Sequence, residues 1–383
     1  MTAVGPGSGP GSGPGPGGGA RLPERGQAFR RATHRALLLH LLRRYGPATR
    51  QMLARRSELS PTTVSSLVVE LEERGLVVQR PVILGRAGRR PSLVSFNPAA
   101  GTALAVELGP RHLAVMVGSR SQLALAQRWV DLPPGLSRQA VAQAVLDCTE
   151  GVLADTSSGP ELLNGVVLTV GPRTYPEAAG QSAEQWPATL VHLLRQRWRV
   201  PVEVVGGAAL AALAEHAEGG AAGAHSLLHV TWTDRVEMGV VLGGVLHRGP
   251  TGRAGSLGHV VVRPDGALCR CGRRGCLDAY LRPPGGQSPP PGGEGARLVV
   301  EAVTTAALLY DPSVVVLGGA LADPDDGLAA PLAAALRALP GGESQPVPVR
   351  CSTLGDRAVR LGGVHLVLSR QKPSIGTDCA SVP

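Results

Sequence analysis

The apolar residues of this chain follow two different periods, and the change between them falls near residue 101. Before this point they recur at helical spacing, as in the run Val64, Leu67, Val68 and Leu71. After it, short runs of Val, Leu and Ala alternate with helical stretches, which is typical of an α/β architecture. The strands expected there are 104–108, 113–117, 166–170, 202–205, 227–231, 240–242 and 314–317. The pattern therefore predicts a small helical unit followed by a larger α/β body.

The segment before residue 101 has the order of a winged helix-turn-helix domain, with three helices and then two strands. Thr33 is expected to cap the first helix, Thr49 the second and Ser60 the third. Two extended runs follow at 76–80 and 92–97, joined by a loop rich in glycine and arginine. In such a domain the third helix presents its N-terminal end to the major groove.

The positive charge of the chain is concentrated in this same segment. Residues 21–100 contain 15 arginines, no lysine and five glutamates, a net charge of +10, whereas the rest of the chain has a net charge of −1. A basic segment of domain size beside a near-neutral body indicates binding to double-stranded DNA. The side chains expected to contact DNA are Arg50, Arg55, Thr62, Thr63, Ser65, Ser66, Arg86, Arg89 and Arg90. A basic domain that docks to another protein is the alternative that the residues leave open.

Three cysteines lie within eight residues of one another in the second half of the chain. They are Cys269, Cys271 and Cys276, and His259 precedes the first of them by ten residues. Zn²⁺ takes four nitrogen or sulfur ligands, and a closed set of three cysteines and one histidine is typical of a structural site. We therefore expect these four side chains to hold a structural zinc ion. A redox pair or unligated buried cysteines are the alternatives.

The ends of the chain and its linkers give further expectations. Residues 1–24 are rich in Gly, Pro and Ser, which favours a disordered tail, and residues 282–295 have the composition of a loop. No window reaches the ~18 apolar residues of a membrane helix, and the start lacks the features of a secretory signal. The six cysteines do not have the spacing of a disulfide framework. A cytoplasmic protein without a membrane partner is therefore expected.

The stretch from Gly258 to Asp278 resembles the zinc signature of the ROK family (repressors, open reading frames, kinases), a Gly-His pair followed by Cys-x-Cys-Gly-x-x-Gly-Cys-Leu-Glu. The resemblance extends from about Arg30 to Leu368. It implies an α/β fold with an N-terminal winged helix-turn-helix, followed by two actin/hexokinase-like (ribonuclease H-like) lobes and a zinc-binding loop. The expected units are a tail at 1–24, the winged helix-turn-helix at 25–98, a first lobe at 99–207, and a second lobe at 208–383 with the zinc loop at 259–276. Within these boundaries, the C-terminal end of the chain is allowed to pack on the first lobe instead of the second.

The residues that perform catalysis in the kinases of this family are replaced here. The family's first phosphate loop aligns with residues 107–111, which include Pro110, and its second aligns with residues 233–237, which carry two acidic groups. The segment with the catalytic aspartate aligns with 205–209, where no acidic residue is present, and Ser256 replaces a glutamate. The resemblance therefore implies that the chain is not an enzyme. The residues that remain as candidate ligand contacts are His259 and Asp278.

Together these observations predict a DNA-binding transcriptional regulator of the ROK type, most simply a repressor, that has lost kinase activity and controls carbohydrate-related genes. Its expected partner is a double-stranded operator, and a homodimer or tetramer is expected because helix-turn-helix proteins commonly read paired half-sites. Whether a small effector binds is left open. The alternatives are an ATP-dependent sugar kinase and an interaction scaffold that does not bind DNA.

Overall fold

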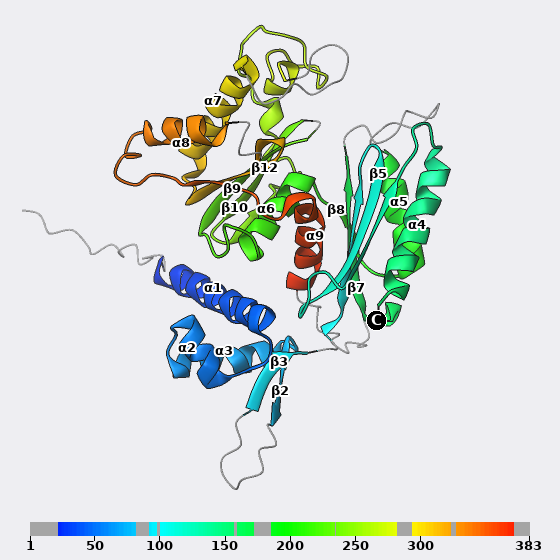
Figure 1. Cartoon of the computed structure of the whole chain (residues 1–383), viewed down its shortest axis with the longest axis vertical. Coiled ribbons are helices and arrows are strands. Elements are labelled where there is room, and N and C mark those ends of the chain that lie inside the picture. The colour runs from blue at the N-terminus through cyan, green and yellow to red at the C-terminus, as the bar shows by residue number, and fades with distance from the viewer. Residues whose placement is uncertain are drawn as a thin grey trace, which may run out of the picture.

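The first unit of the structure is a winged helix made of three helices and a small sheet (Figure 1). The computed structural model describes residues 22–81, 92–97, 100–156, 159–171, 185–233, 235–281, 293–322 and 327–370. The elements of the winged helix are α1 (Leu22–Tyr45), β1 (Ala48–Thr49), α2 (Arg50–Ser57), α3 (Pro61–Glu73), β2 (Val77–Pro81) and β3 (Ser92–Phe96). The strands form one sheet in the order β1-β3-β2, and the helices enclose an aliphatic core with it.

The caps of α2 and α3 are those that the sequence predicts. The Thr49 hydroxyl accepts a hydrogen bond from the backbone N–H of Met52, and the Ser60 hydroxyl accepts one from Thr63. The expectation that Thr33 caps the first helix is wrong, because α1 already begins at Leu22 and Thr33 lies inside it. Pro23, the second residue of α1, is consistent with this start, since proline is tolerated in the first turn of a helix. Residues 22–24 of the expected tail thus belong to α1, and the rest of that tail lies outside the described residues.

The first lobe contains a five-stranded sheet in the order β6-β5-β4-β7-β8. Its strands β4, β5 and β6 pair antiparallel, and β4, β7 and β8 pair parallel. One face packs against α4 and α5 around a mostly aliphatic core that also contains Trp186 and Trp198. The bounds are β4 (Thr102–Leu108), β5 (His112–Ser119), β6 (Ala126–Asp131), α4 (Arg138–Ala154), β7 (Leu163–Val170), α5 (Gln185–Trp198) and β8 (Val202–Val204).

The second lobe repeats this topology with the order β11-β10-β9-β12-β13. Again three strands pair antiparallel and the remaining pairs are parallel, which confirms the predicted α/β fold with two actin/hexokinase-like lobes. Helices α7 and α8 cover its outer face. The bounds are β9 (Ser226–Trp232), β10 (Val236–Leu242), β11 (Val245–His247), α7 (Gly293–Tyr310), β12 (Val314–Gly319), α8 (Ala329–Arg337) and β13 (Val349–Cys351). Residues 293–295 of the expected loop lie in α7, and 282–292 are outside the described residues.

Two helices lie between the sheets of the lobes, α6 (Gly207–Ala217) and α9 (Ala358–Ser369) (Figure 1). Helix α9 packs on β4 and β7 of the first sheet, α6 packs on β9 and β10 of the second, and the two helices contact each other along their length. A side chain at Gly362 would overlap the carbonyl oxygen of Leu210, and one at Gly239 would overlap that of Ala208. Glycine at these two positions therefore sets how closely α6 approaches α9 and the second sheet. No described helix is long and apolar enough to cross a membrane.

The close contact at Gly362 gives a prediction for stability. We expect Gly362→Ala to lower the free energy of unfolding by about 1–3 kcal/mol, because the added methyl group must push α9 away from the rigid backbone of α6. Gly220→Ala is the matched control, since a Cβ there meets no atom within 4 Å. Denaturant unfolding of both variants checks this, and equal stability of Gly362→Ala and wild type would contradict it.

Candidate nucleic-acid interface and metal centre

Helix α3 is amphipathic, and its outward face carries the polar residues that the sequence singles out. Thr62 and Ser66 are exposed, Thr63 and Ser65 are half-buried, and the apolar stripe packs into the core of the winged helix. The hydroxyls of Thr62 and Thr63 lie 2.9 and 2.8 Å from the Ser60 hydroxyl. The capping residue thus holds the first turn of the outward face in place.

Val69 is an exposed apolar residue on the same face that the sequence analysis missed. It is 43% exposed and follows Thr62 by seven residues, two helical turns. Its neighbour Val68 is fully buried. The two valines are adjacent in an apolar run, so their residue type alone does not show that one is exposed and the other buried. The signal was the spacing, because Val69 stands off the i, i+3, i+4, i+7 pattern of the buried stripe.

An ionic cluster fixes α1 across α3. Arg31 donates hydrogen bonds to the Ser66 hydroxyl at 2.9 Å and to the Glu70 carboxylate at 3.0 Å, and Arg35 and Arg74 also pair with Glu70. Burial alone would raise the pKa of Glu70, but the surrounding guanidinium groups bring it below its ordinary value. Part of the positive charge of this domain is therefore neutralised internally, and the Ser66 hydroxyl already has a partner.

The arginines predicted to contact the DNA backbone form two groups in the sequence, one on α2 and one at residues 86–90. On α2, Arg55 is exposed and Arg50 is half-buried, while the adjacent Arg56 stacks over the Tyr45 ring at 4.6 Å. The expected wing contacts Arg86, Arg89 and Arg90 lie outside the described residues.

The cysteine cluster forms a compact set of ligand atoms in the second lobe. The ligand atoms of His259, Cys269, Cys271 and Cys276 all lie within 4.8 Å of one another. The Cys271 and Cys276 sulfurs are 3.6 Å apart, and the Cys269 sulfur is 3.8 Å from Nδ1 of His259. A tetrahedral zinc ion with about 2.3 Å bonds to sulfur separates its sulfur ligands by about 3.7 Å. The residues therefore fit a tetrahedrally bound metal ion.

Tight turns bring these four residues together. The backbone N–H of Cys269 donates to the carbonyl of Arg273 at 2.7 Å, and Gly275 adopts a φ of +75° where a side chain would overlap the carbonyl oxygen of Arg263. Burial raises the pKa of the Cys276 thiol to about 12, so its ionised form needs a compensating positive charge. A metal ion at the centre of the cluster supplies such a charge.

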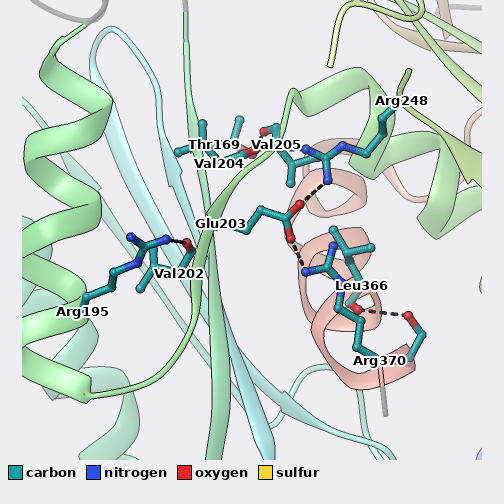
Figure 2. A network of polar contacts seen from close by, with 10 residues as sticks. Thr169, Arg195, Val202, Glu203, Val204, Val205, Arg248, Leu366 and Arg370 are labelled. Atoms are coloured by element: carbon teal, nitrogen blue, oxygen red, sulfur yellow. Dashed lines mark hydrogen bonds and ion pairs between the residues drawn. The ribbon is translucent and has the colours of Figure 1, made fainter. Parts of the chain in front are cut away.

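A cavity of about 670 Å³, here called the interlobe cavity, lies between the two lobes. Its walls are formed on one side by the end of β8 and the first turn of α6, and on the other by residues 248–256 and β10. Glu203 of β8 accepts hydrogen bonds from Arg248 of the second lobe and from Arg370 at the end of α9 (Figure 2). The lining includes Ser256 but, among the described residues, neither His259 nor Asp278. The carboxylate of Asp278 instead accepts from the backbone N–H of Val236 at 3.3 Å.

The turn that aligns with the family's first phosphate loop is filled by side chains of the chain itself. Glu107 pairs at 2.7 Å with Arg360, whose side chain is only 4% exposed. The His112 ring stacks on Trp129 with 4.3 Å between the ring centres, and a side chain at Gly109 would overlap it. The Arg360 guanidinium in turn lies 5.6 Å from the centre of the Trp129 ring. This packing leaves the turn without the open glycine backbone that cradles a phosphate.

Comparison with protein families agrees with both halves of this structure. Residues 103–285 match the profile of the ROK family, and residues 32–86 match that of the MarR family. Over these residues the chain is similar to the ROK family and, at its N-terminal end, to the MarR family. The ROK match contains the metal-binding loop and the cavity-lining residues, and the MarR match contains α2 and α3.

The curated proteins similar to this chain include repressors. The xylose repressor of Bacillus spizizenii is 23% identical over 66% of the chain and 67% of its own length. The DNA-binding transcriptional dual regulator NagC of Escherichia coli is 27% identical over 63% of the chain and 61% of its own length. The alignments thus span about two thirds of these relatives. Both names are those of transcriptional regulators, in agreement with the prediction that this chain is a regulator.

Solved structures show the same fold. A ROK family transcriptional regulator described as a homolog of the E. coli MLC protein superposes with a TM-score of 0.61 at 18% identity, covering 89% of this chain and 96% of that one. A ROK hexokinase from Thermus thermophilus gives a TM-score of 0.54 at 28% identity over 69% of this chain and 96% of its own. The match to the regulator covers a larger share of this chain than the match to the hexokinase, since it extends beyond the two lobes.

Proposed function

We propose that this chain is a transcriptional regulator that binds operator DNA through α3 and uses its ROK domain without kinase activity. The observation that carries the proposal is the outward face of α3, a capped row of small polar residues on a basic winged helix. The repressors and regulators among its relatives support control of carbohydrate-related genes, most simply by repression. A homodimer would present two such helices to paired half-sites, and this role would place the protein in the cytoplasm.

In this proposal the residues of the winged helix divide into two kinds of contact. Thr62, Thr63, Ser65 and Val69 face base edges, and the Val69 methyl groups suit the C5-methyl group of thymine, an apolar contact in the major groove. Arginine side chains contact the phosphates and the minor groove and set the register. These arginines are Arg50, Arg55, Arg86, Arg89 and Arg90. Ser66 contacts a base edge only if its hydroxyl gives up the hydrogen bond from Arg31 and bonds to DNA instead.

The contact at Val69 predicts a change in sequence preference. For a duplex obtained by selection with the full chain, we expect Val69→Ala to weaken specific binding about fivefold or more while nonspecific binding stays unchanged. Val245→Ala, at a 69% exposed apolar residue of the second lobe, is the matched control and should bind as wild type does. Fluorescence anisotropy at several salt concentrations measures both, with log K falling by about 0.9 per phosphate contact per log unit of salt.

Two results of that experiment would contradict the proposal at different levels. Equal loss of specific and nonspecific binding would remove Val69 from the base contacts but leave DNA binding intact. Binding by wild type that is insensitive to salt, or that shows no sequence preference, would contradict the regulator function itself.

We further propose that the metal of the cysteine cluster is zinc and that its role is structural. The donor set is that of closed zinc sites, with His259 and three cysteines as ligands, and the ion would tie the turns of residues 259–276 together. No position remains open for a reacting water, so the zinc would supply folding energy rather than Lewis-acid chemistry. His259 is then a metal ligand, and Asp278 accepts a hydrogen bond from the backbone of Val236 instead of contacting a ligand in the cavity.

The zinc proposal predicts metal content and stability. We expect one zinc ion per purified chain by elemental analysis, and Cys276→Ser should lower both zinc content and the melting temperature. Cys351→Ser is the matched control, because Cys351 is a half-buried cysteine outside the cluster. Zinc well below one per chain, or equal melting temperatures of the Cys276 and Cys351 variants, would exclude a structural zinc site.

A further inference from the structure

Helix α6 reaches from the interlobe cavity to the winged helix. At its start, Gly206, Ala208 and Ala209 line the cavity. At its end, the C-cap residue Glu218 accepts a hydrogen bond from Arg43 of α1. A helix of 11 residues is about 16 Å long. One short, straight element therefore contacts both the cavity and the DNA-binding domain.

The packing around α6 keeps it from bending. The carbonyl oxygens of Ala208 and Leu210 contact the glycines of β10 and α9 described above, without room for a Cβ. Glu215, which is completely buried, accepts hydrogen bonds from the backbone N–H of Gly220 at 3.0 Å and from the Ser352 hydroxyl at 2.5 Å. Because its packing leaves no room to bend, α6 would move as one rigid unit, so that a shift of its first turn would also shift Glu218.

The contact at the cavity end can be released at small cost. Arg248 binds Glu203 across the lobes, and it also approaches the carbonyl of Val204 at 3.4 Å (Figure 2). Glu203 has a second partner, Arg370, and the pKa of this carboxyl stays below its ordinary value against the effect of burial because of both guanidinium groups. If Arg248 leaves, Glu203 therefore keeps a paired charge, and the lobes lose a bridge without leaving a buried ion alone.

The contact at the winged-helix end is costly to break. Arg43 is 16% exposed and donates both to Glu218 and, at 3.1 Å, to the carbonyl of Arg120 in the first lobe. Burial and the nearby charge of Arg43 lower the pKa of Arg120 to about 10, so the two guanidinium groups repel each other. Without Glu218, Arg43 would remain half-buried next to a like charge. Movement of Glu218 should therefore carry α1 with it.

We propose that α6 couples the interlobe cavity to the winged helix, with Glu203–Arg248 as the releasable contact at one end and Arg43–Glu218 as the fixed contact at the other. The coupling concerns α1 and exists without DNA, and only its effect on operator affinity rests on the proposed function. Opening of the lobes at the cavity changes the position of α1, and with it the presentation of α3.

The test is a double-mutant cycle in the full chain, read by hydrogen exchange of the α1 amides at residues 38–45 without DNA and by the Kd for a selected operator. We expect Arg248→Gln to change both quantities about fivefold or more. Arg370→Gln is the matched control, because it removes the other partner of Glu203 and leaves the bridge between the lobes. In a Glu218→Gln background, Arg248→Gln should cause no further change. Glu203→Gln breaks the same bridge from the first lobe and should reproduce the effect of Arg248→Gln.

The outcomes separate the coupling from the proposed function. The coupling is wrong if Arg248→Gln and Glu203→Gln leave α1 exchange unchanged, or if Arg248→Gln has the same effect with and without Glu218. Changes in α1 exchange that follow the cycle, together with absence of operator binding by the wild type, would support the coupling and contradict the proposed function. Melting temperatures of all variants identify a change in exchange that comes from general unfolding.

Discussion

The distance between α6 and α9 is the constraint on which the rest of this structure depends. Gly362 and Gly239 allow backbone to meet backbone on both sides of α6, so the two lobes are held at one spacing by two helices and little side-chain volume. This spacing positions the first turn of α6 as a wall of the interlobe cavity and its C-terminal end against Arg43. Because interiors packed this closely transmit strain, the same contacts that stabilise the lobes also connect them to the winged helix.

The two lobes of this chain share the fold of a solved ROK hexokinase, but side chains of the chain itself fill the turn at residues 107–111. In the first lobe, the His112 ring fills the space next to Gly109 and Arg360 pairs with Glu107. The interlobe cavity remains, with glycine and alanine on the α6 side. A fold hosts many functions through the residues placed on it, and at this turn the residues fill the space that a phosphate would need.

Local rules made much of this molecule predictable. Ser60 and Thr49 are capping residues whose effect is limited to one turn, and the seven expected strands are apolar runs long enough to be recognised. The cysteine cluster was predictable because four ligands in one short loop leave few ways to fold. Strand β6 was missed because its Gln127, Arg128 and Trp129 are exposed at the sheet edge, and β11 and β13 because three residues show no period. Two ion pairs, Glu203–Arg248 and Arg43–Glu218, join segments that are distant in the sequence. No local sequence pattern predicts such pairs.

The central claim, that the outward face of α3 reads operator DNA, is tested most directly by a genome-wide map of sites bound by the chain in cells. The account predicts discrete peaks that share a motif repeated with two-fold symmetry at a spacing of about 10 base pairs, one turn of DNA. It also predicts that these peaks disappear for a Thr62→Ala, Val69→Ala double variant that is present at the same level. A map without a shared motif, or one that the double variant leaves unchanged, would contradict it.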